Sequence, residues 1–576
     1  MTQATDSGSG QQGLLRTIDW KGAFWIASGV PALVLISIGG MGATAGKLAF
    51  VAWTISVLMG FIQSFSYAEI AGLFKNKSGG AAVYGAAAWL RDSKFIAPLS
   101  VWCNWYAWTP VLSLGCAIAA GYILNAVAPL PVIDPASPAV QAWIADAANA
   151  AAVAGHSPEE TSKLAVAALT EAGTPWIRAF KVASFSLFGV VQVEIGATFF
   201  IGAILMLVAF AIQHRGVLGT AKIQMYIGLI VLIPMAIVGI APFFNGGVAA
   251  SNLSPLVPPG GAWDNGGWTV FLGALFIAGW STYAFETAVC YTREFKNPAT
   301  DTFKAILWSG VVCVVLYCLV AAAFQGHLGV EGMTAPGIVD GTGVAQAMGE
   351  MVGGGSGFVV HLLEMMMILA LMLAIMMAMA GSSRTLYQGS VDGWLPRYLS
   401  HVNEHGAPTR AMWTDLIFNL GLLTIAASDA TAYYLVLSVS NVGYMIFIFL
   451  NLQSTWIHRI DSPNAERPYR APTALLVLGA LLGFVNLALM GAGAKVWGNP
   501  NALMYGVGFA LLIIPVFVFR HYVQDKGMFP DRMLEDLGIS RGSLGERKAG
   551  FLPYLALALG VLVVVAADLY FQLPPA

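Results

Sequence analysis

The sequence GWSTYAFETAVCYTREFKNP, residues 279–298, begins as an apolar stretch and ends as a charged one that stops at a proline. Glu286 stands in its middle, and no charged residue precedes it back to Asp264. A carboxylate inside a membrane-spanning segment is costly and usually functional. The stretch therefore predicts a membrane segment that keeps one carboxyl group for a specific purpose.

The composition of the whole chain predicts an integral membrane protein. Of its 576 residues, 57% are hydrophobic and only 10% are charged, whereas soluble domains carry about 25% charged residues. A bilayer-spanning helix needs about 20 apolar residues. We therefore expect an all-α protein with about thirteen transmembrane helices, near 24–46, 48–73, 95–127, 193–213, 222–244, 268–291, 304–326, 357–383, 411–427, 431–456, 472–494, 500–520 and 551–571.

The distribution of basic residues predicts the orientation of the chain. If the N-terminus is cytoplasmic, all but five of the 28 Lys and Arg residues fall on the cytoplasmic side, as the positive-inside rule requires. We expect a multi-pass protein of the plasma (inner) membrane with a cytoplasmic N-terminus and an extracytoplasmic C-terminus. Topology accounts for the basic residues, so no nucleic-acid partner is expected. The first 20 residues are polar and predict no cleaved leader.

Hydropathy divides the chain into a core and its additions. One long extracytoplasmic loop, 128–192, is rich in alanine and predicts a helical insertion. No C-x-x-C pair or enzyme motif is present in the sequence, so we expect neither a cofactor, a metal site nor an enzymatic activity. The expected parts are a cytoplasmic tail at 1–21, ten core helices within 22–456, two further helices at 457–524, a cytoplasmic linker at 525–550 and an extra helix at 551–576.

Two predicted spans are poorly suited to a continuous helix. In the first span, SGVPALV places Gly29 beside Pro31, and a proline removes a backbone hydrogen-bond donor. In the sixth span, AGWSTYAFE places Gly279 and two hydroxyl residues near mid-membrane. Interrupted segments at corresponding positions of two halves point to a transporter's binding site. We expect non-helical backbone near 29–32 and near 279–284, with the two breaks facing each other.

Five longer motifs follow one another along the chain, and together they resemble the amino acid–polyamine–organocation permeases over 24–524. The resemblance implies a five-plus-five inverted-repeat core with broken helices 1 and 6. It also implies transport of an amino acid or a related amine by alternating access, coupled to protons or by exchange. The motifs are FSYAEIAGLFKNKSGGAAVYGAAAW from residue 65, QHRGVLGTAKIQ from 213, REFKNPATDTFKAI from 293, SSRTLYQGSVDGWLPRYLSHVNEHGAPTRA from 382 and ERPYRAP from 466.

The same resemblance implies which residues of the sixth span meet the substrate. Gly279, Trp280 and Tyr283 are expected at the binding site, where Trp280 packs on the substrate and the backbone at 280 and 283 receives its amino group. Glu286 is expected to act in gating and protonation. The alternatives are a tryptophan that is only a core aromatic and a carboxylate that only braces the unwound backbone.

In the first span, Ser28, Gly29 and Val30 are expected to receive the substrate's carboxylate. Broken helices leave backbone N–H groups free, and helix N-termini attract anions. The chain departs here from the Gly-x-Gly stretch that is usual in the superfamily.

A second ionisable pair lies in the outer third of the eighth span. HLLEMMM places His361 and Glu364 three residues apart, hence on one helix face. We expect them to act in gating or proton handling, and the alternative is a water-satisfied pair at the extracytoplasmic mouth.

The prediction of the coupling ion rests on two kinds of residue that are missing from the spans. The eighth span has no Ser or Thr from Met365 to Gly381, and the fifth has no lysine near Val231. We therefore expect transport that does not need sodium, with a proton as the candidate coupling ion. The expected partners are a small-molecule amino acid or amine and membrane lipid, and the oligomeric state is left open. The alternatives are a cation/chloride-type ion cotransporter of the same fold and a membrane-embedded enzyme.

Overall fold

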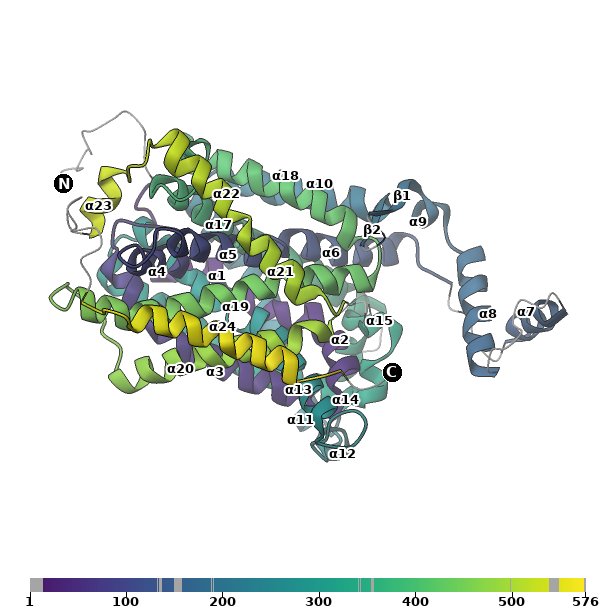
Figure 1. Cartoon of the computed structure of the whole chain (residues 1–576). Coiled ribbons are helices and arrows are strands. Elements are labelled where there is room, and N and C mark those ends of the chain that lie inside the picture. The colour runs from purple at the N-terminus through teal and green to yellow at the C-terminus, as the bar shows by residue number, and fades with distance from the viewer. Residues whose placement is uncertain are drawn as a thin grey trace.

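The computed structural model describes residues 14–131, 133, 137–149, 158–187, 189, 191–339, 341, 343–353, 357–497, 499–537 and 548–573. Parts of the expected N-terminal tail, the expected linker (538–547) and the last three residues lie outside them. Most of the described chain is helical, and the long helices run roughly side by side in one body (Figure 1). The expected all-α membrane fold is confirmed.

The first half of the chain alternates long helices with short connecting pieces. Its elements are α1 (Trp20–Ala27), α2 (Leu33–Ala45), α3 (Ala49–Leu73), α4 (Ala81–Trp89), α5 (Ile96–Trp108), α6 (Val111–Val127), α7 (Pro138–Asn149), α8 (Pro158–Ala172), α9 (Trp176–Ala179), β1 (Lys181–Leu187), β2 (Val191–Gly196), α10 (Ala197–Gln213), α11 (Val217–Phe244), α12 (Ala250–Leu253) and α13 (Asn265–Thr282).

The second half is built in the same way and contains the longest helices. Its elements are α14 (Pro298–Met333), α15 (Pro336–Val339), α16 (Val344–Met351), α17 (Gly357–Val391), α18 (Thr409–Ala426), α19 (Ala430–Asp461), α20 (Thr473–Gly493), α21 (Ala502–Leu511), α22 (Ile513–Val518), α23 (Asp531–Leu537) and α24 (Leu552–Tyr570).

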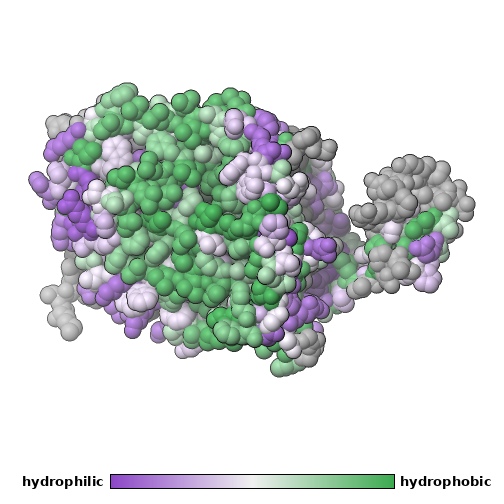
Figure 2. Space-filling view, turned by 90° about the horizontal axis from the view of Figure 1, so that it is seen from below, coloured by the Kyte–Doolittle hydropathy of each residue, from purple (hydrophilic) through white to green (hydrophobic). Residues whose placement is uncertain are grey.

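Length and composition identify the helices that can cross a membrane. Among the described residues, ten helical stretches are long and apolar enough, and Trp20–Leu35 and Ala197–Gln213 are shorter apolar helices. Figure 2 shows a mainly hydrophobic middle with hydrophilic residues gathered toward both ends of the body. Each of the thirteen predicted spans contains helix. The count of thirteen crossings and the inverted repeat stay predictions.

Packing places the two interrupted spans inside the bundle. Helix α3 runs along both α13 and α14, and α17 packs against α6. Helix α19 packs against α5 and α20, and α24 packs against α20. The additional C-terminal helix therefore joins the body through the eleventh predicted span.

The overlong third span is two helices. Helix α5 ends at Trp108 and α6 begins at Val111, with Thr109 and Pro110 between them. Pro110 has no N–H to continue the helical ladder, so the chain bends there. Together, α5 and α6 occupy the 95–127 segment, which hydropathy predicts as one span.

The insertion at 128–192 contains a hairpin that the helical prediction missed. Helices α7 and α8 lie where alanine predicts them, but β1 and β2 pair antiparallel just before the fourth span. Gly189 turns between them with φ +67°, a conformation that suits glycine. Residues 193–196, predicted to begin the fourth span, belong to β2, and the helix itself begins at Ala197.

Buried ion pairs connect the charged motifs. Residues far apart in sequence meet because a buried charge needs a partner. Glu69 lies at the end of α3 and also accepts a hydrogen bond from the backbone N–H of Ala471, 2.8 Å away. The pairs are Glu69 with Arg459 (2.6 Å), Lys77 with Asp392 (2.7 Å) and Glu294 with Arg384 (Nη2 to Oε2, 3.1 Å).

The two lysines of the loop after α3 allow a matched test of these pairs. Lys77→Met should lower the thermal unfolding midpoint of the purified protein clearly, because an uncompensated buried charge on Asp392 costs about 3–5 kcal/mol. Lys75→Met should change it little, because the Lys75–Glu466 pair is exposed and such pairs contribute about 0–1 kcal/mol. Adding Asp392→Asn to Lys77→Met should restore part of the loss. Equal midpoints for the two lysine variants would contradict the argument.

Candidate substrate site between the broken helices

The first span is interrupted where Gly29 and Pro31 predict it. Helix α1 ends at Ala27, a 3-10 turn covers Val30–Ala32, and α2 begins at Leu33. A Cβ on Gly29 would lie 2.9 Å from the backbone carbonyl group of Leu373 in α17. The glycine is therefore required for close packing of the break against the eighth span.

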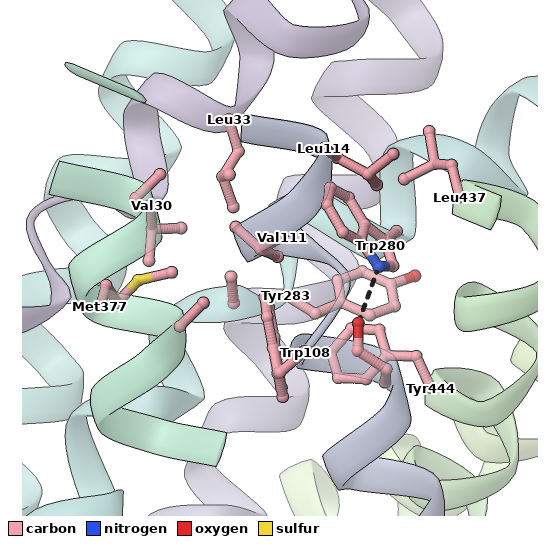
Figure 3. Packing of buried hydrophobic residues seen from close by; sticks show 14 of the residues in the cluster. Val30, Leu33, Trp108, Val111, Leu114, Trp280, Tyr283, Met377, Leu437 and Tyr444 are labelled. Atoms are coloured by element: carbon pink, nitrogen blue, oxygen red, sulfur yellow. Dashed lines mark hydrogen bonds between the residues drawn. The ribbon is translucent and has the colours of Figure 1, made fainter. Parts of the chain in front are cut away.

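The side chain of Ser28 is occupied locally. Its Oγ donates to the carbonyl of Trp25 at 2.6 Å, and it lies beside Gly228 of α11. Val30 is fully buried at the centre of the bundle (Figure 3). The contact of Ser28, Gly29 and Val30 with a substrate carboxylate stays a prediction.

The sixth span breaks later than its glycine suggests. Helix α13 continues through Gly279 to Thr282, and the chain beyond Tyr283 is wound as a 3-10 helix over Ala284–Glu294. A Cβ on Gly279 would lie 2.9 Å from Cε of Met445 and 3.2 Å from the Tyr283 ring. The expectation of a break beginning at residue 279 is corrected, because this glycine makes room for neighbours within the last α-helical turn.

One tyrosine hydroxyl connects the two interruptions. The hydroxyl of Tyr317 in α14 donates to the carbonyl of Val30 at 2.9 Å and is 3.2 Å from the carbonyl of Ser281. Its ring packs against Trp53 of α3, with centroids 5.5 Å apart. Carbonyls at a helix break need partners inside a membrane; the Val30 carbonyl also accepts from the Leu33 N–H, and the single proton of the Tyr317 hydroxyl can be donated to one of the two carbonyls at a time. The breaks therefore face each other, as predicted.

Four buried aromatic residues pack together beside these breaks. The rings of Trp108 and Trp280 stack with centroids 6.2 Å apart, and Trp108 meets Tyr444 edge-on at 5.0 Å. Tyr283 lies 6.3 Å from Tyr444. Figure 3 shows these rings converging from different helices, with the indole N–H of Trp280 donating to the carbonyl of Ala107 at 3.2 Å. Trp280 and Tyr283, both predicted site residues, are thus brought together.

Glu286 lies next to this aromatic cluster. It is 1% exposed, and its Oε1 accepts a hydrogen bond from the indole N–H of Trp108 at 3.1 Å. Within the described residues, its Oε2 has no hydrogen-bond partner. Aromatic faces attract an ammonium group, and a carboxylate can accept its protons. The arrangement can therefore bind an amine.

The pair on the eighth span lies elsewhere. His361 Nδ1 and Glu364 Oε2 are 2.9 Å apart, but the His361 side chain is 76% exposed. Met377, which borders the central cluster in Figure 3, is sixteen residues farther along α17, a distance of about 24 Å at 1.5 Å per residue. The structure does not bring His361 and Glu364 to Glu286, and their role in proton handling stays a prediction.

Sequence reasoning missed a second buried carboxyl group, Asp415 of α18. It is fully buried and accepts hydrogen bonds from Trp105 at 2.6 Å and Thr109 at 2.8 Å, and a short one from Ser382. The signal was present, because Asp415 falls inside the predicted ninth span, and an ionisable residue there is a functional candidate by default.

Comparison with known proteins also identifies permeases. The family model described as amino acid permease matches residues 18–511. The chain is 23% identical over 265 residues to the branched-chain amino acid permease BcaP of Bacillus subtilis, which covers 46% of this chain and 52% of the relative. It is 21% identical over 306 residues to the polyamine transporter PUT1 of rice, Oryza sativa subsp. japonica, covering 50% and 52%.

A third relative is the branched-chain amino acid permease BcaP of Lactococcus lactis, 24% identical over 340 residues, with 57% of this chain and 67% of the relative covered. The chain spans about half the length of the Bacillus and rice relatives. The matched family and these relatives are permeases or transporters, and none of them is described as an enzyme. With a family match over most of its length, this chain belongs to the amino acid permease family, within the amino acid–polyamine–organocation superfamily.

Proposed function

We propose that this permease moves an amino acid or a related amine across the plasma membrane by alternating access, with a cytoplasmic N-terminus and an extracytoplasmic C-terminus. The observation that carries the proposal is the aromatic cluster of Trp108, Trp280, Tyr283 and Tyr444 beside Glu286, at the junction of two interrupted helices. Transport requires movement of the helices, because a buried site can exchange substrate only if the helices around it move.

The cluster supports an ammonium-bearing substrate. An ammonium group between the Trp280 face and the free Oε2 of Glu286 would gain cation–π attraction and a charge-assisted hydrogen bond. Val30, Leu33 and Val111 provide apolar surface on the other side (Figure 3), which suits an aliphatic side chain. The relatives described above are permeases of branched-chain amino acids and a transporter of polyamines, and both kinds of compound carry an amine.

Glu286 is proposed as the gating and proton-handling group. It is buried, and its hydrogen bond to Trp108 joins the sixth span to the third. A change in its protonation alters a contact between two helices, which is how a local charge can bias a conformational equilibrium.

Uptake into proteoliposomes tests the substrate class. We expect saturable uptake of at least one member of a panel of branched-chain amino acids, basic amino acids and polyamines. Initial rates should stay nearly unchanged when choline replaces sodium at constant pH, because the eighth span offers no hydroxyl ligand before Ser382. Flux of potassium, sodium or chloride without any organic solute would overturn the proposal in favour of an ion cotransporter. A steep sodium dependence would contradict the coupling assignment alone.

Trp280→Ala tests the stacking surface. Removing the indole should weaken binding of the transported amine by about 1–2 kcal/mol, roughly five- to thirtyfold in Kd, measured by calorimetry on purified protein. Trp280→Phe should recover part of the affinity because a ring face remains. Trp308→Ala, which removes a half-exposed tryptophan from α14, is the control and should leave the Kd unchanged. Equal affinity for Trp280→Ala and wild type would remove this residue from the site.

Glu286→Gln separates binding from transport. Glutamine keeps the size and can still accept from Trp108, but it cannot release or take up a proton. We expect substrate binding to persist, while the uptake rate becomes low and almost independent of pH. The control is Glu364→Gln on α17, which should keep the wild-type rate and pH profile. If instead Glu364→Gln flattens the pH profile and Glu286→Gln does not, proton handling belongs to the His361–Glu364 pair and Glu286 is a brace.

A further inference from the structure

Asp415 has unusual surroundings for a carboxyl group inside a helix bundle. Its three side-chain partners are the indole of Trp105 and the hydroxyls of Thr109 and Ser382, all of which are neutral. Among the ion pairs found within the described residues, none includes Asp415. A buried carboxylate without a counter-charge is costly, so its retention needs a reason beyond packing.

Two of the three donors lie in the turn that precedes Pro110, where α5 gives way to α6. Trp105 lies in the last turn of α5, and Thr109 follows the end of that helix, directly before Pro110. Residues four apart lie on one helix face, and both reach the same oxygen, Oδ1 of Asp415. Asn419 fixes the arrangement further, because its Nδ2 donates to Thr109 Oγ1 at 2.6 Å and to the Asp415 carbonyl at 2.9 Å.

The other face of the same turn carries the contacts of the substrate site. Between Trp105 and Thr109, the Ala107 carbonyl accepts from Trp280 and the Trp108 indole donates to Glu286. One turn of helix, 105–109, is therefore bonded to Asp415 on one side and to the gating carboxyl group and its neighbouring tryptophan on the other.

We propose that Asp415 is a positioning residue for transport. It holds Trp105 and Thr109 so that the turn before Pro110 has one fixed orientation, and that orientation directs Trp108 at Glu286. The inference rests on the proposed role of Glu286. Asp415 itself touches neither Glu286 nor the aromatic cluster through any hydrogen bond or ring contact found in the described residues.

The chemistry of the partners requires a hydrogen-bond acceptor at this position. The Trp105 indole can only donate, and the Thr109 hydroxyl, which accepts from Asn419, donates to the same Oδ1 of Asp415. An asparagine could keep its oxygen for these two residues and turn its NH2 group to Ser382, whose hydroxyl can accept. Asp415→Leu has a similar branched shape but no acceptor, so it leaves the donors without their partner and should disturb the turn.

The test is a double-mutant cycle on uptake rates in proteoliposomes. Asp415→Leu should lower the maximal rate by about tenfold with little change in substrate Kd, and the conservative Asp415→Asn should recover most of that rate. Combined with Glu286→Gln, Asp415→Leu should lower the rate no further than Glu286→Gln alone, because the turn affects the rate only through the proton-dependent gating that Glu286→Gln already removes. Asp429→Asn, at the exposed N-cap of α19, is the matched control and should keep the wild-type rate.

The outcomes separate this inference from the function on which it rests. If Glu286→Gln is slow and Asp415→Leu lowers its rate by the same factor as in wild type, Asp415 is merely structural and the inference fails alone. It also fails alone if Asp415→Asn is as slow as Asp415→Leu, because the hydrogen bonds would then not be what matters. If Glu286→Gln transports at the wild-type rate, the gating role fails and the inference fails with it. Should Asp415→Leu not fold, Trp105→Phe and Thr109→Val each remove one donor and enter the same cycle, with the same non-additivity expected.

Discussion

The hydroxyl of Tyr317 is the contact on which the centre of this permease depends. A membrane helix can be interrupted only where the freed carbonyls find partners inside the protein. Tyr317 bonds to Val30 and lies within hydrogen-bond distance of Ser281, so the first and sixth spans are interrupted at one shared point. Because its ring rests on Trp53, this point is fixed to α3 as well. The sixth span continues from that junction to Glu286, and its course places Glu286 beside the aromatic cluster.

Charge is used sparingly and in two different ways. At the loop ends of helices, carboxylates such as Glu69, Asp392 and Glu294 meet a lysine or an arginine, and the paired residues are 90 to 390 positions apart in the sequence. At the centre, Glu286 and Asp415 instead receive neutral indole and hydroxyl donors. Neutral partners leave a carboxyl group able to change its charge without losing a salt bridge. This property suits a region of the protein that changes conformation.

The sequence predicted the architecture well because hydrophobic length and backbone chemistry are local properties. The helical segments, the interruption beside Pro31 and the position of Trp280 and Glu286 near each other all follow from such local signals or from the family resemblance. The break of the sixth span was misplaced by about one turn, since Gly279 is needed to admit Met445 and Tyr283. Which glycine loosens a helix and which one admits a neighbour depends on tertiary contacts. The β1–β2 hairpin and Asp415 were missed because alanine-rich and apolar surroundings outweighed short polar signals.

The winding of Ala284–Glu294 changes the geometry of this part of the sixth span. A 3-10 helix rises about 2.0 Å per residue and an α-helix about 1.5 Å, so these eleven residues extend about 22 Å instead of about 16 Å. Residues three apart also fall on a straight line in such a helix, which aligns Glu286, Val289 and Thr292 parallel to the axis. The segment is thus a narrow rod with three straight rows of side chains, one of which contains Glu286, and it is longer and thinner than the α-helix that the same residues would otherwise form.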